Sequence, residues 1–144
     1  MQVKYIPEGY HTITPYVVIQ GLAKLITFLK EGFDAIEIRK IDLPDGSVTH
    51  AELKIGDSMV MFSESKEGSP PRAASFYLYV KDTDMVYKKA LDAGGISLME
   101  PVDQYYGDRN AGIKDPSGNI WYIATHFEDL TSEELMEREK QKKK

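Results

Sequence analysis

The sequence contains no cysteine, only three histidines and no long apolar run. Without cysteine the chain can form neither a disulfide framework, nor a thiolate metal site, nor a cysteine nucleophile. No apolar stretch approaches the roughly 20 residues that a membrane-spanning helix requires. Residues 1–7 lack the apolar core of a signal peptide. These absences favour a cytoplasmic protein that does not enter a membrane.

Two catalytic or binding motifs are also missing. There is no Gly-x-Ser-x-Gly elbow and no glycine-rich nucleotide loop, because Gly94 and Gly95 follow a predicted helix as a C-terminal cap does. The net charge of −5 argues against nucleic acid as the main partner. With 42% hydrophobic and 28% charged residues, the composition is that of an ordinary globular chain. We expect one domain spanning residues 1–144.

What the chain does contain is a pattern of elements that repeats at an offset of 61 residues. The strand-like segments that correspond are 14–19 with 75–80 and 57–62 with 118–123, and the helical patterns are 22–32 and 83–93. The repeat predicts two internal modules, at approximately residues 10–65 and 73–128. Residues 66–72 are the most linker-like stretch and lie between them.

A third helical segment is predicted in the tail, residues 129–144. Thr131 followed by Glu134 has the spacing of a capping box. The tail ends in Lys140 and the lysines 142–144, which suit the C-terminal end of a solvated helix. Contact with RNA or a membrane is the less favoured interpretation of this basic run.

Strand alternation predicts which side chains face a concave surface, because successive residues point to opposite faces. Phe76, Leu78, Trp121 and Ile123 are the apolar set expected to face the helix of the second module. The opposite faces are expected to carry aromatic, thioether or hydroxyl-bearing side chains: Tyr16, Met59, Met61, Ser63, Tyr77, Tyr79 and Tyr122. Such a lining suits flat or apolar ligands. The alternative is a closed core whose tyrosines reach a partner or solvent.

Five stretches in this order resemble the vicinal oxygen chelate superfamily, also called the glyoxalase/bleomycin-resistance/dioxygenase fold, and within it the PhnB-like branch. They are residues 13–18, 50–58, 106–109, 114–119 and 123–126. The resemblance extends over roughly residues 10–128. It implies an α+β fold in which two repeated βαβββ modules form a cupped mixed β-sheet with helices outside, followed here by the C-terminal helix. It also implies a homodimer, often with the cup completed by both chains.

Metal-dependent members of that superfamily carry four His, Gln or Glu ligands, two in each module. Carried over by the repeat, those positions here are Thr14, Met61, Ser75 and Tyr122. None of these side chains is a good ligand for a hard or borderline divalent ion. We therefore expect no metal and no cofactor. Glyoxalase and extradiol dioxygenase chemistry, which require the ion as a Lewis acid, are expected to be absent.

Two polar groups remain open to more than one interpretation. His50 and Glu52 lie two apart on one predicted strand and share a face. They could hold an ion, or form a cross-strand polar pair or a dimer contact. Arg109 could clamp a ligand carboxylate or phosphate in a bidentate way. It could equally pair with Asp108 or Asp115 and order the loop.

The sequence thus predicts a metal-independent small-molecule binding protein, with the ligand in a concave sheet cavity at or near a dimer interface. The predicted ligand-binding residues are Tyr16, Glu52, Met61, Tyr77, Tyr79, Arg109 and Tyr122. One alternative is a lyase, isomerase or dioxygenase with a non-standard site around His50, Glu52 and Arg109. Another is a purely structural dimer with a degenerate cavity. No pattern indicates the methyl-donor site that some names of PhnB-like proteins suggest.

Overall fold

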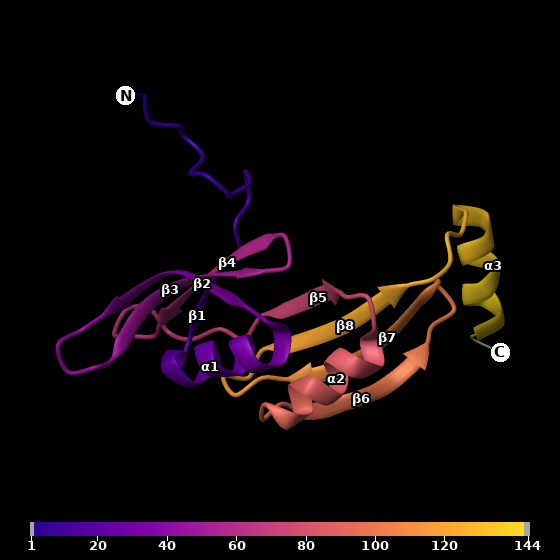
Figure 1. Cartoon of the computed structure of the whole chain (residues 1–144). Coiled ribbons are helices and arrows are strands. Elements are labelled where there is room, and N and C mark those ends of the chain that lie inside the picture. Colours follow the sequence, from indigo (N-terminus) through magenta and orange to yellow (C-terminus); the bar gives the residue numbers. More distant parts are fainter. Residues whose placement is uncertain (1, 143–144) are drawn as a thin grey trace.

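The computed structural model describes residues 2–142 and contains two modules of the same architecture (Figure 1). The first module consists of β1 (Tyr16–Ile19), α1 (Leu22–Phe33), β2 (Ile36–Asp42), β3 (Val48–Ile55) and β4 (Ser58–Glu64). The second consists of β5 (Ser75–Tyr79), α2 (Thr83–Asp92), β6 (Ile96–Asp103), β7 (Asp108–Lys114) and β8 (Ile120–His126), and α3 (Ser132–Lys142) follows it. The predicted α+β fold of two βαβββ modules with a C-terminal helix is confirmed. Within residues 2–142 no helix has the length and apolar character needed to cross a bilayer.

Each module forms its own four-stranded mixed sheet, in the orders β1-β4-β3-β2 and β5-β8-β7-β6. β1 is parallel to β4 and β5 is parallel to β8, whereas the other neighbouring strands are antiparallel. Tyr16 pairs with Met61 in the first sheet, and Tyr77 pairs with Tyr122 in the second. The two registers therefore correspond, and β1 and β5 occupy equivalent sheet edges.

The helices cover one face of each sheet and contact each other (Figure 1). α1 forms because its apolar residues recur at helical spacing. Leu22, Leu25 and Leu29 lie on the face of α1 that packs into the core and are fully buried there. Burying each such side chain contributes roughly 1.5–3 kcal/mol. Gly32 of α1 lies next to Ala90 of α2, and a Cβ added at Gly32 would lie 3.4 Å from the Ala90 Cα, at about ordinary contact distance. The outer faces of the two sheets are thus joined through α1 and α2.

An aromatic cluster connects the cores of the two modules. The Trp121 ring stacks on Phe76 at a centroid distance of 4.2 Å and lies 5.0 Å from the ring of Phe33 in α1. The buried Trp121 indole N–H donates to Asp115 Oδ2 at 2.8 Å, so its one polar atom is satisfied. The apolar core is consequently continuous from one module to the other.

Carboxylates satisfy the exposed N–H groups at the starts of two helices. Glu64, at the end of β4, accepts from Gly21 N at 3.0 and 3.1 Å and from Leu22 N at 3.0 Å. Asp82 accepts from Met85 N in the first turn of α2. Both carboxylates are favourable at the positive end of a helix dipole. The predicted capping box of α3 is confirmed by reciprocal hydrogen bonds between Thr131 and Glu134.

The repeat offset is not constant, as the sequence had suggested, but changes by one residue inside each module. It is 61 between β1 and β5 and between β4 and β8, but 60 between β3 and β7. The reason is the hairpin length, since Ile55 pairs directly with Ser58 whereas Asp115 N bonds to Asn119 O around a longer turn. A one-residue shift exchanges the two faces of a strand. The residues of β7 that share a face with Tyr77 are therefore set by this turn.

The first strand is shorter than predicted. It begins at Tyr16, whereas the sequence suggested residues 14–19. Ile13 is 83% exposed, and Pro15 can accept a backbone hydrogen bond, from Met61 N, but cannot donate one. The predicted helices 22–32 and 83–93 are correct to within one residue at their C-terminal ends.

Candidate functional site

The helices leave the second face of each sheet open, and tyrosines gather there. In β5, Phe76 and Leu78 pack against the core, whereas Tyr77 and Tyr79 are 43% and 63% exposed. In β8, Trp121 is buried and Tyr122 is 38% exposed. The predicted orientation of these strands is therefore confirmed. Tyr77 lies 5.2 Å from Tyr79 and 6.2 Å from Tyr122 between ring centroids, so the three rings form one aromatic surface.

Exposed apolar residues occur at corresponding positions of the two modules. On the strands farthest from β1 and β5, the exposed pairs are Ile36 with Ile96, Ile38 with Leu98 and Ile41 with Val102. Tyr16 on β1 corresponds to Tyr77 on β5 and is also exposed. Large apolar side chains that are clustered and exposed mark a binding or assembly surface. Each module therefore offers one such surface.

A cluster of five polar residues crosses the open face of the first module. Ser63 Oγ lies 2.9 Å from His50 Nδ1 and 2.8 Å from the Tyr16 hydroxyl. His50 Nε2 lies 3.0 Å from Glu52 Oε2, and the Tyr10 hydroxyl donates to Glu52 Oε1. Strand pairing explains the arrangement, because His50 and Ser63 are directly opposite each other on β3 and β4.

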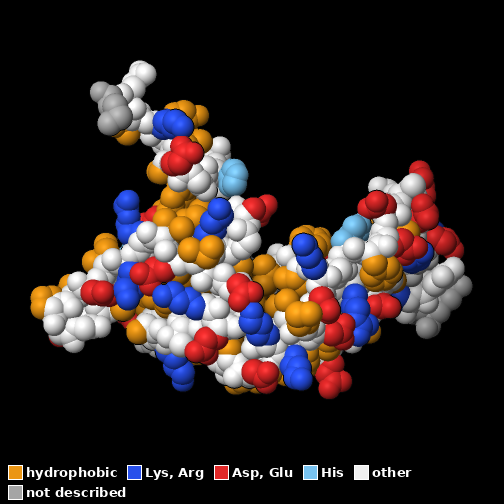
Figure 2. All heavy atoms as spheres, viewed as in Figure 1, with side chains coloured by type: hydrophobic (Ala, Val, Ile, Leu, Met, Phe, Trp, Pro, Cys, Tyr) orange, Lys and Arg blue, Asp and Glu red, His pale blue; other side chains and the backbone are white. Residues whose placement is uncertain are grey.

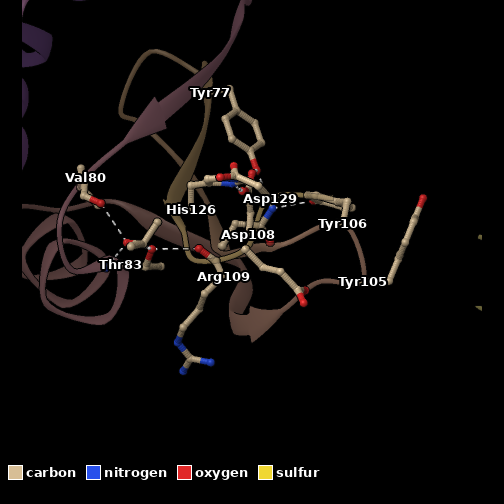
Figure 3. A network of polar contacts seen from close by, with 12 residues as sticks. Tyr77, Val80, Thr83, Tyr105, Tyr106, Asp108, Arg109, His126 and Asp129 are labelled. Atoms are coloured by element: carbon tan, nitrogen blue, oxygen red, sulfur yellow. Dashed lines mark hydrogen bonds and ion pairs between the residues drawn. The ribbon is translucent and has the colours of Figure 1, made fainter. Parts of the chain in front are cut away.

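A larger polar network occupies the open face of the second module (Figure 3). The Tyr77 hydroxyl donates to Asp108 Oδ2 at 2.6 Å and accepts from Asn110 Nδ2 at 3.1 Å. Asn110 also donates to the Tyr106 hydroxyl at 2.7 Å and accepts from Gln104 at 2.9 Å. Asp108 and Asn110 are buried beneath the tyrosine rings. The network fixes the orientation of Tyr77 at the base of the aromatic surface.

His126 extends this network to the surface. Its Nδ1 lies 2.7 Å from Asp108 Oδ1 and its Nε2 lies 2.7 Å from Asp129 Oδ1. The hydrogen bond to Asp108, and then that to Asp129, raise the pKa of the His126 imidazole above its usual value. Burial and the hydrogen bond to Asp108 hold the pKa of the Tyr77 phenol well above its usual value. Tyr77 is therefore a hydrogen-bond donor at neutral pH.

Arg109 is directed away from this network (Figure 3). Its guanidinium binds both carboxylate oxygens of Asp84 in α2, at 2.8 and 2.9 Å, and Asp103 in β6 at 3.1 Å. Of the two alternatives for Arg109, a structural ion pair is the one observed, but its partners are not Asp108 or Asp115, and strand alternation places Arg109 on the face opposite Asp108. Asp115 instead orders the β7–β8 turn and accepts from Trp121. Arg109 is thus engaged in fastening α2 to the second sheet.

Six of the seven predicted site residues fall into two groups, one on the open face of each module, and Arg109 belongs to neither group. Tyr16, Glu52 and Met61 lie on the open face of the first module, and Met61 is partly buried between them. Tyr77, Tyr79 and Tyr122 lie on that of the second. Sequence reasoning missed the roles of Tyr10, Asp108, Asn110 and His126 in the two polar networks. The available signal for the second network was the alternation of Asp108 and Asn110 along one strand.

A cleft of about 360 Å³ lies between the modules. It runs along β5 and is walled by the β3–β4 hairpin and the N-terminal segment, with His11, Ile13, Met59, Tyr77 and Tyr79 among its lining residues. Figure 2 shows the wider hollow that opens above β5 and β8, between this hairpin and the end of the molecule that carries α3. The aromatic surface of the second module thus borders a concave space.

The residues at the repeat-related ligand positions do not fit a divalent metal ion. Thr14, Met61, Ser75 and Tyr122 offer hydroxyl, thioether and phenol groups, none of which binds such ions well. Among residues 2–142, no group of three or more His, Asp or Glu side chains is arranged to hold an ion. His50 and Glu52 are instead hydrogen-bonded to each other across one strand face.

Comparison with known proteins identifies a relative in sequence and solved structures with a similar fold. The chain is 28% identical over 137 residues to Mb0911c of Mycobacterium bovis, covering 85% of this chain and 88% of that protein. TioX from Micromonospora sp. ML1 superposes with a TM-score of 0.70 at 18% identity, covering 81% of this chain and 99% of TioX. The PhnB protein from Bacillus cereus, described as a putative 3-demethylubiquinone-9 3-methyltransferase, superposes with a TM-score of 0.62 at 19% identity, covering 80% and 99%.

A model of one protein family matches residues 10–123, which include both modules from before β1 to within β8. That range contains the residues of both open faces except those at the end of β8 and beyond. The chain belongs to the Glyoxalase/Bleomycin resistance protein/Dioxygenase superfamily.

Proposed function

We propose that the protein binds a small organic molecule, without a metal ion, in a cavity completed by a second copy of the chain. The observation that carries this proposal is the aromatic surface of Tyr77, Tyr79 and Tyr122, exposed at the rim of a concave space. Exposed rings held in fixed positions offer stacking area at little cost in side-chain freedom. The polar groups beneath them supply directional hydrogen bonds.

The chemistry of the ligand follows from this surface. A flat, apolar or aromatic body can stack on the three rings, whose spacing leaves each ring edge or face accessible. A polar substituent can reach the Tyr77 hydroxyl, which is already anchored by Asp108 and Asn110. An anchored hydroxyl binds at a smaller entropic cost than a freely rotating one. The proposed ligand is therefore a flat molecule with at least one hydrogen-bonding group.

The open edges and faces support a homodimer. β1 and β5 each end a sheet, and both adjoining faces carry exposed isoleucine, leucine, valine or tyrosine side chains. Uncovered strand edges and apolar faces are commonly protected by association. In the proposed dimer the first module of one copy faces the second module of its partner. Tyr16, Glu52 and Met61 would then complete a cavity with the partner's tyrosines.

The alternative set of His50, Glu52 and Arg109 lacks comparable support. His50 and Glu52 lie on β3 in the first sheet, whereas Arg109 lies on β7 in the second and binds Asp84 and Asp103. An enzymatic site that requires all three residues would have to bring together side chains from different sheets and release existing ion pairs. We therefore favour a binding function over a lyase, isomerase or dioxygenase site of this composition.

The test is to examine protein purified without chelator. Sedimentation at micromolar concentration should give a mass near twice 16.3 kDa. Elemental analysis should show well under one Zn, Ni, Mn or Fe per chain. Denaturing the protein should release a flat organic molecule that mass spectrometry detects. The same molecule should bind again to the native parent protein. A clean monomer, or a stoichiometric metal whose restoration raises the melting temperature, would contradict the corresponding part of the proposal.

A further inference from the structure

In the polar cluster of the first module, the donor and the acceptor of each hydrogen bond can be assigned. Glu52 can only accept, so the proton on the His50 ring is on Nε2 and Nδ1 is an acceptor. Ser63 then donates its hydroxyl proton to His50 Nδ1 at 2.9 Å and accepts from the Tyr16 hydroxyl at 2.8 Å. Tyr10 donates to the second oxygen of Glu52. Every group in the cluster is satisfied by a single consistent arrangement of protons.

From this geometry we infer that Ser63, His50 and Glu52 form a nucleophilic site that hydrolyses activated esters of small acyl groups. A serine within hydrogen-bond reach of a base, with the base held by a third group, is the structural signature of an activated nucleophile. Before the attack Tyr16 donates its one hydroxyl proton to Ser63 Oγ. As the oxyanion forms, this proton turns from Ser63 Oγ to the oxyanion and stabilises it, because the Tyr16 hydroxyl lies beside Ser63 Oγ and the side chain is exposed. Glu52 holds the ring of His50 and favours its protonated form during the reaction.

The reaction proceeds in two steps. Ser63 Oγ attacks the acyl carbon, its proton passes to His50 Nδ1, and the carbonyl oxygen becomes an oxyanion that accepts from Tyr16. When the C–O bond of the leaving group breaks, His50 returns the proton to the departing alcohol or phenol, leaving an ester on Ser63. Water then attacks this ester with His50 again as the base, and the acid product and free Ser63 are released.

The sheet gives the site its rigidity. His50 and Ser63 are a directly opposed pair on antiparallel strands, and Glu52 is two residues along β3 on the same face. Tyr16 comes from the neighbouring parallel strand β1. Side chains on adjacent strands are held within fixed limits by the backbone hydrogen bonds, which is the precision that a reacting group needs.

The second module is an internal control for this assignment. Its residues at the positions of His50 and Ser63 are Asn110 and Ala124, which are likewise directly opposed. Neither can act as base or nucleophile. The repeat therefore retains the paired geometry but only the first module carries the reactive groups. The inference needs neither a dimer nor a metal ion. It shares Tyr16 and Glu52 with the proposed binding cavity, but acylation of Ser63 tests it separately from ligand binding.

The experiment uses the full-length protein and p-nitrophenyl acetate. The parent should release p-nitrophenolate faster than buffer, and mass spectrometry of quenched protein should locate one acetyl group on Ser63. Ser63→Ala and His50→Gln should each lower the rate by about 100-fold or more. Ser65→Ala is the matched control, because Ser65 lies two residues further along and outside the cluster. Circular dichroism and melting temperature establish that each variant is folded.

A second measurement does not depend on ester turnover. The chain has no cysteine, so Ser63→Cys introduces a single thiol. Its rate of alkylation by iodoacetamide against pH should give a pKa below the ordinary value of about 8.5, and adding His50→Gln should return the pKa toward that value. Ser65→Cys should show an ordinary pKa. Hydrolysis that persists in Ser63→Ala, no acetyl group on Ser63, or equal thiol pKa values with and without His50 would overturn the inference.

Discussion

At the position where the first module pairs His50 with Ser63, the second pairs Asn110 with Ala124. The backbone frames are equivalent, yet the two open faces have different chemistry. The first links three hydroxyls, one imidazole and one carboxylate. The second surrounds a buried amide with tyrosines and places an imidazole between two carboxylates. The difference shows that the repeated fold determines which backbone positions lie close together, whereas the residue types at those positions determine the chemistry of the site.

The helical sides of the two modules, by contrast, are joined. α1 contacts α2, and Phe33 of the first module packs against Trp121 of the second. A change on this side should therefore affect both modules, whereas a change on an open face should affect one. Substitutions on the two sides test this contrast directly.

The largest effect is expected from Trp121→Leu. The change removes the ring that stacks between Phe33 and Phe76 and leaves Asp115 without the indole donor. We expect the free energy of unfolding to fall by about 2–4 kcal/mol, with a single transition in urea monitored by circular dichroism. Ligand preference should be unchanged, since Trp121 is only 2% exposed and is not part of the aromatic surface of Tyr77, Tyr79 and Tyr122. Two separate transitions would show that the modules unfold independently.

A smaller loss of stability is expected from Asn110→Ala. The buried amide serves Tyr77, Tyr106 and Gln104, and its removal leaves these groups short of partners. The cost should be about 1–3 kcal/mol in urea unfolding. The repeat-related change His50→Ala should cost less, because His50 is less buried than Asn110 and the Tyr10 hydroxyl still donates to Glu52. If both variants lost the same free energy of unfolding, the network around Asn110 would not be more important for stability than the cluster around His50.

Much of this contrast could be anticipated from the sequence, and some of it could not. The alternation of Phe76, Tyr77, Leu78 and Tyr79 predicted the two faces of β5, because a half-buried strand needs one apolar side. The partner of Arg109 could not be predicted. Asp84 lies 25 residues away and approaches only because α2 packs on β7. Contacts of that kind depend on tertiary structure rather than on local pattern.

The two hydrogen-bond networks could not be predicted from the sequence for a related reason. They depend on strand register, and register depends on the lengths of turns. The turn at Gly56 and Asp57 is shorter than the turn at residues 116–118, which shifts β7 by one position relative to the repeat. A constant offset of 61 residues therefore places the wrong residues of β7 beside Tyr77. The His50–Glu52 pair could be foreseen because both lie on one strand, whereas its contact with Ser63 required the register.

Replacing Tyr77 and Tyr122 together with phenylalanine separates binding from stability on the second face. The rings remain, while the Tyr77 hydroxyl no longer donates to Asp108. Unfolding should become easier by roughly 1–2 kcal/mol. Affinity for a polar flat ligand, measured by calorimetry with the molecule that co-purifies, should fall more than stability does. Tyr16→Phe is the matched change on the first module. If the double variant binds as tightly as the parent, the Tyr77 hydroxyl is not part of the site.

The smallest expected effect is a pH dependence centred on His126. Asp108, and then Asp129, raise the pKa of this imidazole in the folded protein above its unfolded value of about 6.5. Between these two pKa values the folded state binds more protons, so its stability falls as pH rises. The stabilisation is complete below the unfolded pKa and is lost as pH passes the folded one. His126→Gln should remove this contribution to the pH dependence of unfolding.

The cause of the raised pKa can be assigned with two further variants. NMR titration of the His126 ring should show that Asp108→Asn lowers its pKa more than Asp129→Asn does, because Asp108 is buried and raises that pKa more strongly. Asp129 is almost fully exposed, so water screens its charge. A folded pKa for His126 at or below 6.5 would mean that the carboxylates of Asp108 and Asp129 do not stabilise the charge of its ring.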